Sequence, residues 1–191
     1  YFLIDKKNNH SLLIDPGSDI KLIEEEINKQ RCIPQNILLT HGHLDHIGCV
    51  RIIQEKYNMN VYLHEDDIKL SKELKEYCDY FGMTLFEPPI ITNIIKNEKN
   101  ILINKLNIDI IHTPGHTAGG ISYKIDNNLF VGDVLFNNSI GRTDLPGGDL
   151  KILLNSINKR LFILPDITSV YSGHGPSTTI GYERKNNQFL I

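Results

Sequence analysis

The order of apolar and polar positions along the chain predicts short strands that alternate with short helices. Residues 1–17 fit a hairpin around the polar pair Asn8-Asn9. Isoleucines at helical spacing then follow Ser18 and Asp19, either of which can cap a helix. Further strands are predicted at 36–40, 60–63, 106–112, 121–125, 129–132 and 168–171, and further helices at 50–57, 65–80, 150–161 and one ending at Glu183.

Hairpins and strand–helix alternations occur together, which predicts mixed sheets covered by helices in an α+β fold. No linker, repeat or low-complexity tract interrupts this pattern, so a single domain is predicted over residues 1–191. The chain begins at Tyr1, without a methionine and inside a predicted strand, so the sequence is compatible with a first strand that is missing or a leader that was removed.

The composition is that of a globular protein and argues against several classes of partner. Of 191 residues, 40% are hydrophobic and 23% are charged, and the net charge is -3. No basic stripe predicts a nucleic-acid partner or an anionic membrane, and no apolar run is long enough to span a bilayer. The 3 cysteines have no C-x-x-C spacing, which predicts buried or free thiols and a cytoplasmic protein.

The stretch T-H-G-H-L-D-H-I-G, from Thr40 to Gly48, holds three of the 8 histidines. Other isolated histidines and aspartates also follow the ends of predicted strands. Because strand ends on one side of a layered fold converge, these side chains are expected to form a common site. The seven candidates are His41, His43, Asp45 and His46 after the strand 36–40, His116 after 106–112, Asp133 after 129–132 and His174 after 168–171.

Imidazole nitrogens and carboxylate oxygens are ligands that zinc prefers, and they also suit iron and manganese. The spacing predicts two divalent cations. His41, His43 and His116 are assigned to the first ion, Asp45, His46 and His174 to the second, and Asp133 to both. For any one residue alone, a hydrogen-bonded side chain at a turn is the alternative. That structural or surface role is predicted for the other histidines, His10, His64 and His112.

The motifs T-H-G-H-L-D-H, T-P-G-H-T, G-D and S-G-H-G-P, in this order, resemble those of the metallo-β-lactamase-fold superfamily. The resemblance spans nearly the whole chain. It implies a four-layer αββα sandwich with the metal site at one edge of two mixed sheets. The run L-F-N-N-S-I-G-R-T-D-L-P-G-G-D further resembles the glyoxalase II-like (hydroxyacylglutathione hydrolase-like) enzymes, especially their single-domain members. A small thioester, such as one derived from glutathione, is the substrate that this resemblance implies.

Three departures qualify the resemblance. The ending G-P-S-T-T-I-G-Y-E-R-K-N-N-Q-F-L is similar to that group, but Asn187-Gln188 stands where the group usually has Asn-Pro. The sequence also ends before the helical domain that supplies glutathione contacts in full-length glyoxalase II. The true β-lactamases of this fold usually lack an aspartate at the bridging position, so Asp133 disfavours antibiotic hydrolysis.

The expected chemistry is attack by a hydroxide that bridges the two ions, since metal binding lowers the pKa of water to about 7. Asp45 and Asp133 are the protein groups expected to act with it. A thioester suits this site, because a thiolate with a conjugate pKa of about 8.5 leaves without a general acid. Arg142, in G-R-T-D, is predicted either to bind a substrate carboxylate or to pair with Asp144, and the sequence favours neither.

Three other functions compete with this hypothesis. A persulfide dioxygenase of the same fold would use one iron, held here by His41, His116 and Asp133, although the segment Leu145–Gly148 resembles the hydrolases better. A non-catalytic binding domain is disfavoured because every ligand position is filled. A nuclease is disfavoured because neither the net charge nor any basic run predicts a nucleic-acid groove.

Overall fold

The structure is a computed structural model, and it describes residues 1–73, 78–79 and 87–190. The chain forms two compact units, Tyr1–Lys96 and Asn97–Ile191, which are described in turn. The expectation of one domain stays a prediction. Among the described helices, none combines the length and the apolar character needed to cross a membrane.

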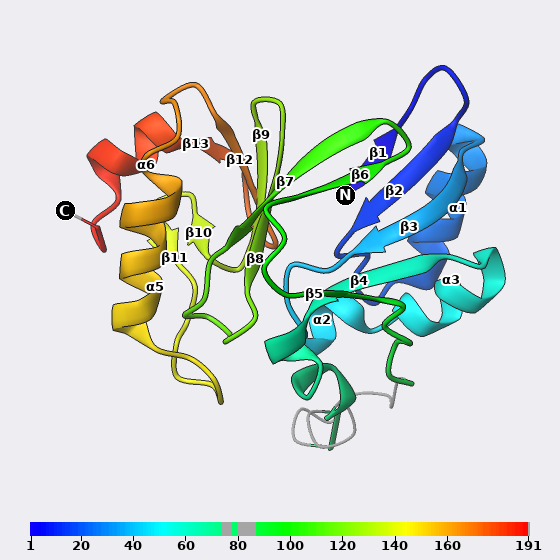
Figure 1. The fold of residues 1–191 in the computed structure, drawn as a ribbon, viewed down its shortest axis with the longest axis horizontal. Coiled ribbons are helices and arrows are strands. Elements are labelled where there is room, and N and C mark those ends of the chain that lie inside the picture. Colours follow the sequence, from blue (N-terminus) through cyan, green and yellow to red (C-terminus); the bar gives the residue numbers. More distant parts are fainter. Residues whose placement is uncertain (74–77, 80–86, 191) are drawn as a thin grey trace. The chain divides into compact units, whose positions relative to one another are not determined.

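The first unit contains a mixed sheet with the strand order β1-β2-β3-β4-β5 (Figure 1). The first two strands form the predicted hairpin, with Phe2 opposite Leu13, and Asn9 takes a positive φ of 59° in its turn. The other neighbouring strands pair in parallel. The strands are β1 (Phe2–Ile4), β2 (His10–Ile14), β3 (Ile33–Leu38), β4 (Asn60–His64) and β5 (Asn93–Ile95).

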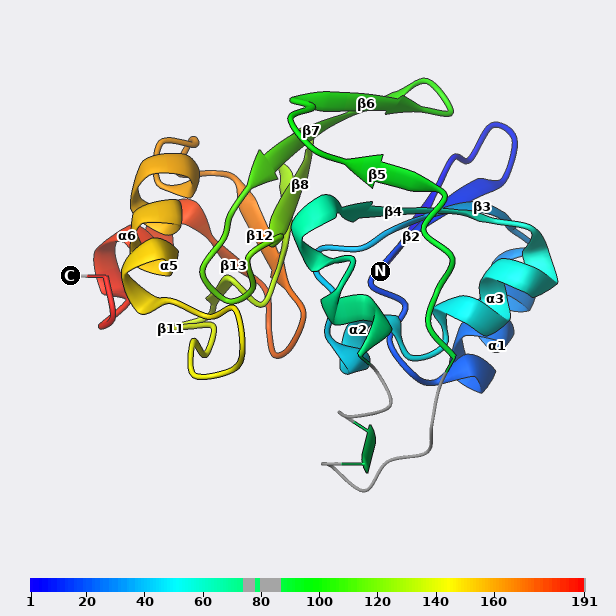
Figure 2. The same ribbon diagram turned by 60° about the horizontal axis from the view of Figure 1, so that its bottom comes forward.

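Helices α1 (Ile20–Gln30) and α3 (Val50–Tyr57) pack on one face of this sheet (Figure 2). Of the two residues predicted to cap α1, Asp19 does so, by accepting a hydrogen bond of 3.0 Å from the backbone N–H of Leu22. Apolar side chains of both helices join those of the strands in one buried cluster. The apolar residues that recur at helical spacing in the sequence are therefore the ones that face this core.

The predicted helix over residues 65–80 is wrong for its described first half, which forms two 3₁₀ turns, η1 (Glu65–Asp67) and η2 (Leu70–Lys72). Residues 74–77 and Tyr80 lie outside the described part. The reason for the difference is a tertiary contact: the Asp67 side chain is fully buried and accepts a hydrogen bond from the backbone N–H of Gly42. An interior carboxylate at this position overrides the amphipathic pattern.

The second unit contains a mixed sheet with the order β13-β12-β9-β8-β7-β6, in which β12 and β9 are parallel and the other pairs antiparallel. The predicted hairpin between β8 and β9 is present, and Asp126 takes a positive φ of 52° in its turn. The strands are β6 (Asn100–Ile103), β7 (Leu106–His112), β8 (Ile121–Ile125), β9 (Asn128–Gly132), β12 (Ser169–Ser172) and β13 (Thr178–Thr179), with a separate hairpin β10 (Leu135–Phe136) and β11 (Ser139–Ile140).

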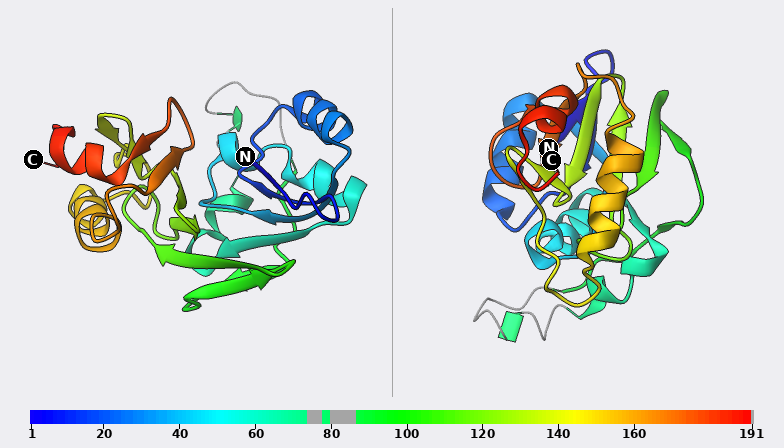
Figure 3. Two further views of the ribbon diagram at one scale, coloured as in Figure 1. Left: turned by 90° about the horizontal axis from the view of Figure 1, so that it is seen from above. Right: turned by 90° about the vertical axis from the view of Figure 1, so that its left-hand side faces the viewer.

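Helices α5 (Leu150–Ser156) and α6 (Ile180–Asn186) lie on the same side of this second sheet (Figure 3). Asp149 caps α5 by accepting from the backbone N–H of Ile152, and α5 continues into a π-helical turn, η3 (Ile157–Leu161). Their apolar faces form a buried cluster with β9 and β12. The helix predicted over 150–161 is thus present, with a wider turn at its end.

Candidate metal centre

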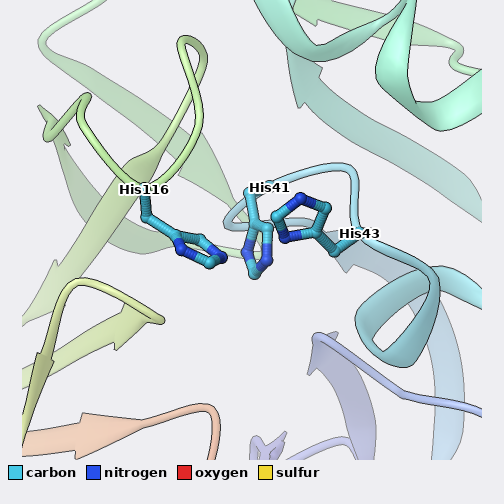
Figure 4. A group of neighbouring side chains, drawn as sticks. All are labelled: His41, His43 and His116. Atoms are coloured by element: carbon cyan, nitrogen blue, oxygen red, sulfur yellow. The ribbon is translucent and has the colours of Figure 1, made fainter. Parts of the chain in front are cut away.

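The loop after β3 gathers the predicted donors of the first unit. His41 and His43 have ring centroids 4.8 Å apart and lie side by side on this loop (Figure 4). The rings of His41 and His46 are 4.1 Å apart, and all three histidines are buried. The exposed carboxylate of Asp45 lies 3.8 Å from His46 Nε2. A short helix that the sequence pattern does not predict, α2 (Leu44–Ile47), carries Asp45 and His46.

Asp15, which sequence reasoning missed, orients two of these histidines. Its side chain is only 7% exposed, and its Oδ2 accepts hydrogen bonds from His46 Nδ1 at 2.9 Å and from the Thr40 hydroxyl at 2.6 Å. Its Oδ1 accepts from the Thr40 backbone N–H at 2.8 Å. Since the Thr40 proton goes to Asp15, the Thr40 oxygen accepts from His41 Nδ1 at 3.0 Å. In both rings Nε2 therefore carries the lone pair that a metal needs.

The backbone around Asp15 also has an uncommon conformation. Asp15 takes a positive φ of 44° directly before Pro16, where extended backbone is preferred. A conformation of this kind costs about 1–3 kcal/mol and is typical of functional sites. The signal that could have identified Asp15 is its position at the end of β2, equivalent to that of the predicted donors.

Gly42 lets the histidine loop pass close to the turns η1 and η2. A Cβ atom at this position would lie 3.0 Å from the Asp67 carbonyl oxygen and 3.1 Å from the Ser71 nitrogen. The Gly42 N–H also donates to Asp67 Oδ2 at 3.0 Å. The main chain between His41 and His43 is thereby fixed by a buried carboxylate.

The second unit brings its three predicted donors together. Asp133 Oδ2 lies 3.8 Å from His116 Nε2 and 3.6 Å from His174 Nε2. Asp133 and His174 follow the parallel neighbours β9 and β12, so their strands end at the same edge of the sheet. His116 and Asp133 are largely buried, whereas the His174 side chain is 57% exposed. One carboxylate oxygen thus faces two imidazoles, and the bridging role of Asp133 stays a prediction.

Gly141 and Arg142 form the backbone that supports His116. His116 Nδ1 donates to the Arg142 carbonyl oxygen at 2.7 Å, which leaves on Nε2 the lone pair that a metal needs. A Cβ atom at Gly141 would lie 1.8 Å from the Asp133 carbonyl oxygen, so only glycine fits there. This segment therefore sets the orientation of one donor and lies against the backbone of another.

The Arg142 side chain forms an ion pair with Asp144, which is one of the two roles predicted for it. Its Nε and Nη2 donate to the two carboxylate oxygens of Asp144, each at 2.7 Å. The hydrogen bond from Arg142 lowers the pKa of Asp144 to about 2. Both side chains are exposed. A substrate-binding role for Arg142 stays a prediction.

The histidines expected to be structural have backbone partners. His64 Nδ1 accepts from the Asp66 backbone N–H, and its Nε2 lies 3.2 Å from the Lys96 carbonyl oxygen. His112 Nε2 lies 3.0 Å from the Ala118 carbonyl oxygen. The structural role expected of both stays a prediction.

The cysteines are free and buried, as predicted. Burial raises the pKa of Cys49, directly after the histidine loop, to about 12. Its sulfur is therefore a thiol at neutral pH and a poor nucleophile.

The chain belongs to the metallo-β-lactamase superfamily, whose family model matches residues 1–174. It is 38% identical to the "Probable metallo-hydrolase YqgX" of Bacillus subtilis, covering 100% of this chain and 90% of that protein. It is 36% identical to the "Hydroxyacylglutathione hydrolase GloC" of Haemophilus influenzae, covering 97% of this chain and 89% of the relative.

Two solved structures confirm the predicted metallo-β-lactamase fold and its α+β class. The "BLEG-1 B3 metallo-beta-lactamase" has a TM-score of 0.93 and 38% identity, covering 99% of this chain and 92% of that one. The structure of "TTHA1623 in a di-iron-bound form" has a TM-score of 0.89 and 35% identity, covering 100% of this chain and 93% of that one. The family and the histidine–aspartate clusters together mark this chain as a metallo-hydrolase with candidate metal ligands.

Proposed function

We propose that this protein is a dinuclear metallohydrolase that cleaves thioesters of the hydroxyacylglutathione type. The observation that carries the proposal is the orientation of the imidazoles. Nδ1 of His41, His46 and His116 each meets an oxygen atom, and in each case this leaves Nε2 as the donor for a metal. Such tautomer control in both units is expected of a metal centre and is not needed for packing.

The proposed ligand set keeps the assignment made from the spacing. His41, His43 and His116 hold one ion, Asp45, His46 and His174 hold the second, and Asp133 bridges them. Nitrogen and carboxylate donors suit zinc, with iron and manganese as alternatives. The di-iron form of the 35% identical structure supports a two-metal site and makes iron a specific alternative to zinc.

Two divalent cations in this site would activate water and polarise a substrate carbonyl. The protein's part is to fix the donors and balance the charge. Asp133 Oδ2, which faces two imidazoles, and Asp45 together contribute two negative charges. The thiol state of Cys49 argues against a cysteine nucleophile here. A thiolate leaving group, with a conjugate pKa of about 8.5, departs without a dedicated acid.

The substrate is proposed from the relative named hydroxyacylglutathione hydrolase and from the carboxylates that a glutathione thioester carries. Arg142 would bind one of these carboxylates. Its bidentate pair with Asp144 is exposed, so a substrate carboxylate can replace Asp144 at the same guanidinium fork.

The first experiment is metal analysis of protein purified without added metal, followed by assays of the metallated protein with S-lactoylglutathione. Two ions per chain and hydrolysis that is lost in Asp133→Ala and His46→Ala support the proposal. His10→Gln is the control, since His10 lies outside the ligand set and should keep full activity. A fully metallated protein without thioesterase activity would refute the thioester assignment.

Two alternatives are decided with the same sample. The 38% identical metallo-β-lactamase structure makes β-lactam hydrolysis a specific second candidate, and turnover of a β-lactam without thioester turnover would establish it. One iron per chain, with oxygen uptake in the presence of glutathione persulfide, would establish the dioxygenase hypothesis instead.

A further inference from the structure

The last helix, α6, holds a buried carboxylate that none of the proposed chemistry uses. Glu183 is fully buried, and its Oε1 accepts a hydrogen bond from the Thr178 hydroxyl at 2.6 Å. Its Oε2 accepts from the Asn138 backbone N–H at 3.0 Å and from the Asn187 side-chain amide at 2.8 Å. Burying a carboxylate is costly unless donors surround it, and here three do.

Two of these three contacts lead to the β10–β11 hairpin. Asn138 occupies its turn with a positive φ of 57°, and its side chain accepts from the Tyr182 hydroxyl at 3.2 Å. Asn187, which is also fully buried, donates to the Ser139 carbonyl oxygen at 2.9 Å. Helix α6 and Asn187, which directly follows it, therefore form hydrogen bonds with main-chain and side-chain groups in the turn of the hairpin.

The same hairpin connects two segments of the candidate metal centre. It begins at Leu135, two residues after Asp133, and it ends at Ile140, directly before Gly141. The Gly141 N–H donates to the Val134 carbonyl oxygen at 3.3 Å, which closes the base of the hairpin. The next carbonyl group, that of Arg142, receives the Nδ1 proton of His116.

We infer that Glu183 is a positioning residue for the metal centre and acts through the β10–β11 hairpin. The inference rests on the proposed function. Glu183 fixes Asn138, the hairpin fixes Gly141 and Arg142, and the Arg142 carbonyl fixes the ring of His116. The C-terminal motif that resembles the glyoxalase II-like group thus has a role in the orientation of a ligand, beyond tail packing.

The test uses the metal-free protein, so that its readout does not depend on activity. The solvent exchange rate of the His116 Nδ1 proton is measured by NMR, with the signal assigned by its absence in His116→Gln. Glu183→Ala should exchange about tenfold faster, because the Asn138 N–H loses its acceptor and the Asn187 amide loses the carboxylate that orients it towards Ser139. Zinc titration should show an affinity weaker by a similar factor.

Two variants separate positioning from stability. Thr178→Val is the matched control, because it removes a hydrogen bond from the same carboxylate without touching the hairpin, and it should leave the exchange rate unchanged. Glu183→Gln should keep most of the protection of the His116 Nδ1 proton from exchange. The amide oxygen of the glutamine can accept from the two N–H donors, while its NH₂ group donates to the Thr178 hydroxyl.

If Glu183→Ala does not fold, Tyr182→Phe provides the test, with exchange about twofold to threefold faster through loss of its bond to Asn138. Equal acceleration in Thr178→Val and Glu183→Ala would overturn the inference, as would unchanged exchange in a folded Glu183→Ala or, failing that, in Tyr182→Phe. Absence of metal binding by the wild-type protein would refute the proposed function separately, because the exchange measurement needs no metal.

Discussion

The substitution Asp15→Asn tests whether the imidazole tautomers are set by the protein. Asparagine keeps the size of the side chain and tolerates the positive φ of 44° at this position. It replaces one acceptor oxygen by an NH₂ group in a place where Asp15 accepts three hydrogen bonds from Thr40 and His46. At least one donor must then face another donor.

The two orientations of the new amide have different costs. If its nitrogen faces His46, the imidazole must move its proton to Nε2, which removes the lone pair proposed to bind metal. If its nitrogen faces the Thr40 backbone N–H instead, a buried donor loses its acceptor at a cost of about 1–3 kcal/mol. Loss of such an outer contact typically weakens metal affinity by about 10- to 100-fold, which corresponds to ~1.4–2.7 kcal/mol.

The assay is a zinc titration in competition with a chromophoric chelator, together with urea unfolding of the metal-free protein. Asp19→Asn is the matched control, because asparagine caps a helix as well as aspartate does and the Asp19 side chain caps α1. Unchanged zinc affinity in a folded Asp15→Asn protein would refute the argument that Asp15 sets the ligand atom of His46.

Three further predictions follow from single contacts. Cys49, with its pKa raised to about 12, should resist a thiol-specific disulfide reagent at pH 7 in the folded protein and react on unfolding; rapid reaction of the native protein would contradict its burial. Gly141→Ala should destabilise the protein by about 1–3 kcal/mol in urea unfolding, because its Cβ would overlap the Asp133 carbonyl. The pKa of Asp144 is lowered from 3.8 to about 2, so its pairing with Arg142 stabilises the fold above about pH 4 and is lost as the pH falls towards 2. The stability difference between wild type and Asp144→Asn should therefore shrink as the pH falls from about 4 and vanish below about pH 2.

The sequence predicts most elements because their signals are local. The strand Leu106–His112 and the helix Val50–Tyr57 are found with the predicted bounds. In both, the spacing of the apolar residues and the turn residues on either side indicate the same ends. Helix α2 was missed because four residues are too few to show a period. Strands β5 and β6 were missed because they are short and polar residues surround them.

The sequence predicts the donor residues of the candidate site, but it does not predict the hydrogen bonds that orient them. Strand-end positions select the histidines and aspartates, because loops at one sheet edge converge. The contact of Asp15 with Thr40 joins residues 25 positions apart and that of Glu183 with Asn138 joins residues 45 positions apart, which no local pattern reports. The Arg142–Asp144 pair, by contrast, joins residues two positions apart, and it was one of the two roles that the sequence predicted for Arg142.

The contacts of Asp15 with His46 and, through Thr40, with His41 have a consequence for metal loading. The two imidazoles are proposed ligands of different ions, yet both are ordered by one carboxylate, directly or through Thr40. An ion that immobilises either ring also reduces the freedom of the other, so the second ion meets a ligand that is already ordered. Uptake of the two ions should therefore be cooperative, and the binding isotherm of the wild-type protein should be steeper than that of Thr40→Val, in which this link is cut.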